Sequence, residues 1–183
     1  MRSEAIDEGD SLIIVGSGNV AWNVYRIAVI LGYQVTVIDN RAMTLTRDRF
    51  PEASRLLLGE DVISLLKSCS ITETTSVVLT SSHHEFDLAA LCELANSPAR
   101  YVGALGNRRK VTAYYAALEA MSATPEWLER VHVPIGLDIG GHKAAEIALS
   151  IMAEIQSVKY GRPGGFVVLQ ERRKGIAKRD ELF

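Results

Sequence analysis

Residues 12–21 read LIIVGSGNVA. Leu12 to Val15 form a short apolar run, which is typical of a parallel strand that is buried on both faces. Gly16 to Ala21 then match the pattern G-x-G-x-x-G/A, in which the glycines permit a tight turn and close approach of a phosphate to the backbone. Apolar residues at helical spacing follow, namely Val20, Val24, Ile27, Ala28 and Leu31. The stretch therefore predicts a strand, a phosphate-binding turn and the start of a helix.

The rest of the chain continues this alternation of strands and helices. Gly32 marks the end of the first helix, and a second strand is predicted at 35–39. Further strands are predicted at 76–80, 101–105 and 166–169, helices at 51–58, 85–95, 107–121 and 144–158, and a weak strand running into a helix at 62–68. The order predicts a single α/β domain with a doubly wound, mostly parallel, Rossmann-like sheet. We expect this domain to span 12–170, between a flexible leader at 1–11 and a charged tail at 171–183.

The composition sets limits on the class of protein. The chain has 183 residues, enough for one domain, and a formal net charge of −2, which predicts no general affinity for nucleic acid or anionic membranes. No apolar stretch reaches the roughly 20 residues of a membrane span, and the polar start of the chain is unlike a secretory signal. The two cysteines, Cys69 and Cys92, lack metal-site or disulfide spacing. We expect a cytoplasmic protein.

Three residues at the end of the second predicted strand extend the glycine-turn hypothesis. Asp39 lies 18 residues after Ala21, where a carboxylate can accept hydrogen bonds from an adenosine ribose and disfavour a 2′-phosphate. Asn40 follows it, and Arg41 weakens the preference, because a guanidinium can bind a 2′-phosphate. The alternative is a glycine turn that closes the sheet and binds nothing.

Three further loops are expected at the same edge of the sheet. The loop at 103–110 reads GALGNRRK and places three cations in the first turn of a helix, which indicates a compensating anion or else a solvated basic face. The loop at 134–142 reads PIGLDIGGH and is either a backbone nest for an anion or a structural turn. It has His142 where a Walker A loop needs lysine, so a P-loop is excluded.

The fourth loop, at 81–87, reads SSHHEFD. His83 and His84 are weak candidates for metal ligands, because position 88 is leucine and an HExxH motif is incomplete; the alternative is a helix N-cap at Ser82 or His83. We therefore predict no metal site. The candidate ligand-binding residues are Gly16, Ser17, Gly18, Asn19, Val20, Ala21, Asp39, Asn40, Arg41, Ser82, His84, Gly103, Gly106, Asn107, Arg108 and Asp138.

Catalytic motifs are missing from the sequence. None of the six tyrosines begins a Tyr-x-x-x-Lys motif, and no G-x-S-x-G motif occurs. An enzymatic activity is therefore left open, with a non-catalytic role favoured.

With these loops identified, the sequence resembles the C-terminal Rossmann domain of the XdhC/CoxI family, the xanthine dehydrogenase accessory factors. The resemblance spans about 12–162. It is carried by residues 13–21 (IIVGSGNVA), 35–41 (VTVIDNR), 97–110 (SPARYVGALGNRRK), 134–140 (PIGLDIG) and 146–155 (EIALSIMAEI). At 81–84 the family often has Thr-His-Asp-His, of which only His84 matches fully.

The resemblance implies an accessory role in the maturation of a molybdenum hydroxylase of the xanthine dehydrogenase type. It implies binding of molybdenum cofactor, and the hydroxylase apoenzyme as a partner, whereas the anion-binding loops suit NAD(P) as well. It also implies a separate N-terminal accessory subunit, because family members usually carry a domain before this one. Two alternatives stay open, an NAD(P)-dependent oxidoreductase and an NAD-sensing regulatory module. An apolar sheet edge near Phe166 predicts a homodimer.

Overall fold

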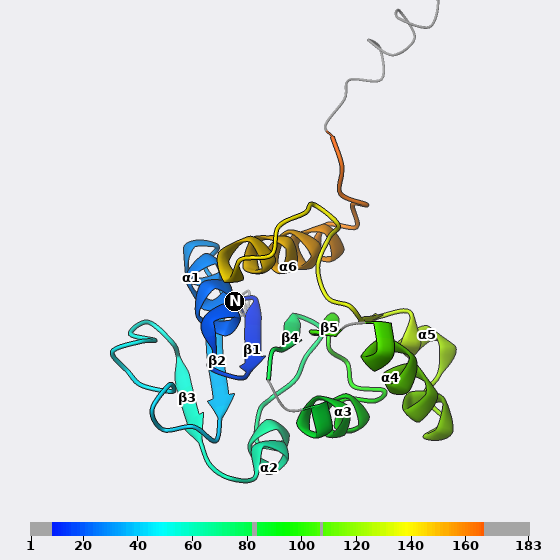
Figure 1. The fold of residues 1–183 in the computed structure, drawn as a ribbon, viewed down its shortest axis with the longest axis horizontal. Helices are drawn as coiled ribbons and strands as arrows, with labels where there is room; N and C mark the ends of the chain where they lie inside the picture. Colours follow the sequence, from blue (N-terminus) through cyan, green and yellow to red (C-terminus); the bar gives the residue numbers. More distant parts are fainter. Residues whose placement is uncertain (1–8, 82–83, 107, 167–183) are drawn as a thin grey trace, which may run out of the picture.

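The computed structural model describes residues 9–81, 84–106 and 108–166, and these contain one six-stranded sheet (Figure 1). All its strands are parallel, and they lie in the order β3-β2-β1-β4-β5-β6. Their bounds are β1 Ser11–Val15, β2 Gln34–Asp39, β3 Arg55–Leu58, β4 Thr75–Leu79, β5 Tyr101–Ala104 and β6 Val131–His132. The predicted doubly wound, Rossmann-like sheet in a single α/β domain is confirmed.

Helices cover both faces of this sheet (Figure 1). Their bounds are α1 Asn19–Ile30, α2 Val62–Lys67, α3 His84–Glu93, α4 Arg108–Ala120, α5 Pro125–Leu128 and α6 Ala144–Lys159. One core cluster joins α1 and α6 to the face that carries Leu12 and Ile14, and the other joins α2, α3, α4 and α5 to the face that carries Ile13 and Val15. Adjacent residues of β1 therefore enter opposite cores, which explains why this strand is apolar throughout.

The first β-α-β unit forms as the sequence predicts. β1 runs directly into the glycine turn, and α1 ends at Ile30, with Gly32 in the left-handed region at φ +79° just beyond its cap. β2 then pairs with β1 in parallel. The turn between β1 and α1 is thereby fixed at the carboxyl edge of the sheet.

Two of the shorter segments differ from the prediction. Residues 51–58 form no helix: Arg55–Leu58 is the edge strand β3, whose central leucines, Leu56 and Leu57, pack into the two opposite cores. The segment at 62–68 is only a helix, α2, because the carboxylate of Asp61 accepts a hydrogen bond from the Ser64 amide and caps it. In addition, α5 and the two-residue strand β6 were not predicted.

The predictions for the two ends of the chain can be compared with the structure only in small part. The proposed leader and tail fall largely outside the described residues, as do 167–169 of the predicted last strand. Phe166, the last described residue, has a 99% exposed side chain. The domain limits and the homodimer therefore stay predictions.

An ion cluster joins the beginning and the end of the domain at the amino edge of the sheet. The carboxylate of Asp10, just before β1, contacts Arg100 Nη1 at 2.6 Å and Lys159 Nζ at 2.5 Å. Arg100 immediately precedes β5, and Lys159 is the last residue of α6. Burial alone would raise the pKa of Asp10, but hydrogen bonds from the two cations outweigh it and lower that pKa.

Candidate functional site

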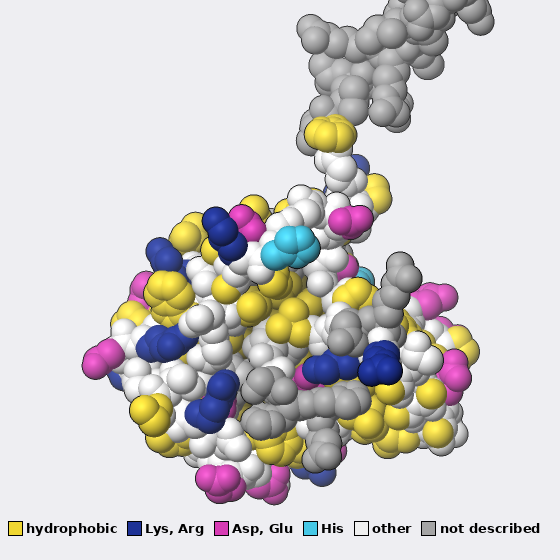
Figure 2. Space-filling view, in the orientation of Figure 1, with side chains coloured by type: hydrophobic (Ala, Val, Ile, Leu, Met, Phe, Trp, Pro, Cys, Tyr) yellow, Lys and Arg dark blue, Asp and Glu magenta, His cyan; other side chains and the backbone are white. Residues whose placement is uncertain are grey.

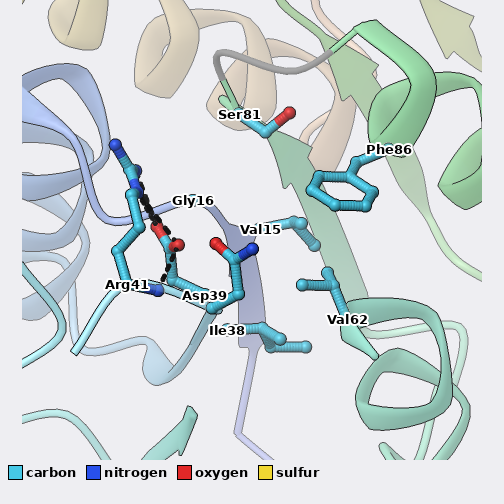
Figure 3. A pocket seen from close by; sticks show the side chains of 9 residues that line it. Val15, Gly16, Ile38, Asp39, Arg41, Val62, Ser81 and Phe86 are labelled. Atoms are coloured by element: carbon cyan, nitrogen blue, oxygen red, sulfur yellow. Dashed lines mark hydrogen bonds and ion pairs between the residues drawn. The ribbon is translucent and has the colours of Figure 1, made fainter. Parts of the chain in front are cut away.

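The order in which strands are added to the sheet reverses on either side of the boundary between β1 and β4. From β1 it builds outward to β2 and β3, and then returns to the other side of β1 to add β4. Ligands of open parallel sheets bind outside the carboxyl ends of the strands at such a switch point. Here the structure has a small hollow, lined by Gly16 after β1, Asp39 at the end of β2 and Ser81 after β4 (Figure 3).

The two glycines of the turn, Gly16 and Gly18, differ in whether the fold has room for a side chain. Gly16 has φ +111°, and a Cβ there would lie 2.9 Å from Thr80 Oγ1 and 3.1 Å from the Ser81 amide. Gly16 is therefore required for the turn to form at all. Gly18 has an ordinary φ of −72°, and a Cβ on it would meet no atom of the described residues within 4 Å. Gly18 is thus not needed for packing, and its bare backbone faces open space.

The first turn of α1 carries no cap. Gly18 occupies the N-cap position, no side chain of the described residues caps the helix, and its first turn has no acidic residue. Ala21, the third helical residue, is fully buried, as its packing role predicts. Amides at such a helix start lack intrahelical partners and carry about half a positive charge, so this end of α1 suits an anion.

Asp39 ties the glycine turn to β2. Its Oδ2 accepts hydrogen bonds from the Ser17 amide and the Ser17 hydroxyl, both at 2.6 Å, and the same hydroxyl lies 2.6 Å from Thr44 Oγ1. Arg41 adds an ion pair, with Nη2 2.7 Å from Oδ2 and Nε 3.1 Å from Oδ1 (Figure 3). The carboxylate is therefore engaged by groups of the chain itself.

These contacts set the charge of Asp39. Burial, the largest single influence, would raise the pKa of its carboxyl group, but hydrogen bonds from Arg41 and Ser17 outweigh it and lower the pKa to about 2. The same contact raises the pKa of Arg41. At neutral pH the pair is fully ionised and nearly neutral as a unit.

The other walls of the hollow come mainly from residues that the sequence did not single out, although the elements that carry them were predicted. Val62 at the start of α2, Phe86 in α3 and Ile38 in β2 supply apolar surface, and Asn40 and Arg41 complete the lining (Figure 3). Neither Val62 nor Phe86 belongs to a recognisable motif, and only the fold brings them beside Asp39. A water-sized sphere can reach only about 10 Å³ of this hollow, about the space of one water molecule, so a base or a ribose would lie over it rather than inside it.

The basic loop after β5 is only partly described. Arg108, Arg109 and Lys110 do begin α4, as predicted, and Arg109 is exposed. Gly103 lies within β5, where a Cβ would be 2.6 Å from the Ile135 side chain, so packing against Ile135 accounts for this glycine. Gly106 is close to Val133 in the same way, at 3.3 Å. Asn107 lies outside the described residues.

The loop before α6 is satisfied internally. Gly136, Gly140 and Gly141 have positive φ, and the amides of His142 and Lys143 both donate to Glu146 Oε2 at 2.9 Å. The anion that these amides bind is therefore the carboxylate of Glu146, in the helix that follows the loop. Asp138 is exposed and lines a different hollow, with Ile139 and Phe166, so the structure does not bring it to Asp39.

The loop after β4 lies partly outside the described residues, namely at Ser82 and His83, and His84 begins α3. Its described part is anchored by Asp87, which is fully buried and accepts hydrogen bonds from the Ser81 hydroxyl at 2.6 Å and from the Tyr114 hydroxyl at 3.4 Å. Across 9–81, 84–106 and 108–166, no three His, Cys, Asp or Glu residues come together as metal ligands. No helix in that part of the chain has both the length and the apolarity to cross a membrane.

Charge is unevenly spread over the surface. On the face shown in Figure 2, Lys and Arg side chains stand on both sides of the centre, and acidic side chains lie mainly toward the rim. The formal net charge of −2 hides this separation.

The strand order, the switch point and the glycine turn together define a Rossmann-like domain. Residues 12–155 match the family described as the XdhC Rossmann domain. The chain belongs to this family, and the resemblance inferred from the sequence is confirmed.

Relatives and a solved structure agree with this assignment. The chain is 30% identical to the uncharacterized protein YqeB of Escherichia coli (strain K12), over 90% of this chain and 30% of that protein. It is 25% identical to a probable xanthine dehydrogenase subunit of Bacillus subtilis (strain 168), over 85% of this chain and 44% of that protein. A crystal structure of a xanthine dehydrogenase from Bacillus halodurans has a similar fold, with a TM-score of 0.73 at 24% identity, over 84% of this chain and 44% of that one. The matched region thus spans less than half the length of each of these proteins.

Proposed function

We propose that this domain binds a dinucleotide or another phosphate-bearing cofactor in the crevice at the carboxyl ends of β1, β2 and β4. The observation that carries the proposal is Gly18, whose backbone is open to space at the uncapped start of α1. A pyrophosphate would lie against the first turn of α1, where the unpaired amides favour it. An adenosine ribose would lie near Asp39, and its base would lie over the apolar surface of Val62 and Phe86.

For the whole protein we propose an accessory role in the maturation of a molybdenum hydroxylase of the xanthine dehydrogenase type. The family and the name of the Bacillus subtilis relative support this role. Molybdenum cofactor and NAD(P) both carry phosphate, so the amides of α1 suit either ligand. The hydroxylase apoenzyme is the proposed partner, and a further one is a separate accessory subunit.

The test is a blocking substitution with a matched control. Gly18→Val places a side chain where the ligand phosphate would lie, without a steric conflict inside the fold. Titration calorimetry with NAD⁺, NADP⁺ and molybdenum cofactor should show binding to the unmodified chain and a loss of at least about tenfold in the variant, at an unchanged Tm. Gly9→Val, at the opposite edge of the sheet, has a nearest contact of 3.8 Å and should leave binding intact.

The outcomes separate the candidate functions. Binding of molybdenum cofactor, together with capture of the hydroxylase apoenzyme, supports the accessory role. Binding of NAD⁺ alone favours a sensing module, and hydride transfer to a small carbonyl compound favours an oxidoreductase. If none of these ligands binds, the proposal is wrong.

A further inference from the structure

The carboxylate of Asp39 has no lone pair left to accept a further hydrogen bond in this structure. Its two oxygens offer about four lone-pair positions for hydrogen bonds. They already face the amide and hydroxyl of Ser17 and the amide, Nε and Nη2 of Arg41. The Asp39 side chain is also only 5% exposed. A ribose diol could therefore hydrogen-bond to Asp39 only by displacing a contact that holds the glycine turn.

The group that this end of the hollow presents to a ligand is a cation. Arg41 is 39% exposed, lines the hollow together with Asn40, and lies beside the Asp39 carboxylate (Figure 3). The hydrogen bonds that Arg41 donates to described residues use its amide, Nε and Nη2, and none of them uses Nη1. The guanidinium can thus keep its contact with Asp39 and still donate outward.

We propose that the crevice selects a ligand with a phosphate on the ribose next to Arg41, such as a 2′-phosphorylated adenine dinucleotide, over the same ligand with a free ribose diol. This inference rests on the proposed nucleotide binding and specifies its ligand class. A phosphate accepts charge-assisted hydrogen bonds from a guanidinium. The repulsion that a bare carboxylate would exert on it is offset, because Arg41 neutralises Asp39.

The choice can be measured with two pairs of ligands. NADP⁺ and NAD⁺ differ only in the 2′-phosphate, whereas adenosine 2′,5′-bisphosphate and ADP carry two phosphates each and differ in their position. Titration calorimetry on the full chain should give affinities about tenfold or more higher for NADP⁺ and for the 2′,5′-bisphosphate, the scale of one hydrogen-bonded charge contact.

Two variants assign the preference to Arg41. Arg41→Ala should lower the ratio of the NADP⁺ affinity to the NAD⁺ affinity to about one or below, and Arg41→Lys should retain part of the preference because the charge persists. Arg26→Ala is the matched control, since Arg26 is an exposed arginine of α1 that stacks on Trp22, 4.8 Å from the ring centre.

The results distinguish this inference from the proposed function. Equal affinities for NADP⁺ and NAD⁺, or an equal loss of both in Arg41→Ala, would overturn the selection by Arg41 while nucleotide binding stands. Binding of none of the four ligands would overturn both.

Discussion

Two glycine-rich loops of this domain each run into the start of a long helix, yet only one is open. The helices α1 and α6 pack on the same face of the sheet. At the third residue of α6 stands Glu146, whose carboxylate takes the amides of His142 and Lys143. The corresponding residue of α1 is Ala21, which is buried and offers no acceptor. The third helical residue thus decides whether the amide of the N-cap residue is taken by the helix itself or remains available to a ligand.

The comparison teaches that glycines before a helix do not define a binding site. Both loops have residues with positive φ, and both begin helices of 12 residues or more. Each loop has an internal carboxylate, because Asp39 takes the Ser17 amide as Glu146 takes that of His142. What differs is the amide of the N-cap residue, which Glu146 takes at Lys143 and which at Gly18 has no partner among the described residues. The sheet topology agrees with this distinction, because only the α1 loop lines the hollow near the switch point.

The largest effect is expected at Gly16, on which the geometry of the open loop depends. Gly16→Ala combines a strained positive φ with contacts of 2.9–3.1 Å to Thr80 and Ser81, and should lower the free energy of unfolding by about 2–4 kcal/mol. Urea denaturation measures this change. Gly18→Ala is the control, because its φ and surroundings accept a Cβ. Similar losses in the two variants would show that Gly16 has no special structural role.

A smaller effect is expected where Asp39 secures the open loop. Asp39→Asn should cost about 2 kcal/mol at pH 7, given a carboxyl pKa of about 2 in the folded protein against an ordinary value of 3.8. The lowered pKa means that this stabilisation is complete well above pH 3.8 and declines as the pH falls toward 2. Denaturation curves of both proteins should therefore converge in acid, and a gap that stays constant down to pH 2 would contradict the ion-pair explanation.

The smallest effect is expected at the closed loop. Glu146→Gln removes the charge that holds the amides of His142 and Lys143, and should lower Tm by no more than a few degrees because the site is exposed. Added phosphate or sulfate should then raise the Tm of this variant more than that of the unmodified chain. Glu119→Gln, an exposed change in α4, is the control. An identical response to the anions in all three proteins would break the comparison between the loops.

Much of the fold was predictable because its signals are local. The apolar run before Gly16, the helical spacing after it and Gly32 at the helix end all point to the same unit, and the structure agrees. The segment at 51–58 misled because leucine favours helices, whereas Leu56 and Leu57 pack into two different cores that only the sheet creates. For α5 a signal was present, since Thr124 caps it and Pro125 begins it.

The candidate site was less predictable, because contacts across the fold determine it. The glycine turn and Asp39 could be found from spacing, but the bond from Ser17 to Asp39 spans 22 positions. Val62 and Phe86 reach the hollow from separate helices and belong to no motif. Conversely, the glycines before α6 indicated a site for an external anion. The position of Glu146, three residues after Lys143, was the signal that a carboxylate of the chain itself occupies this site.

The ion cluster at Asp10 has a consequence for longer polypeptides. Because Asp10 forms an ion pair with Lys159, the residue before β1 and the last residue of α6 are held side by side. A domain whose two ends lie close together can be inserted into a larger chain with little disturbance to the domains on either side. The two relatives named above are more than twice the length of the region that matches this chain.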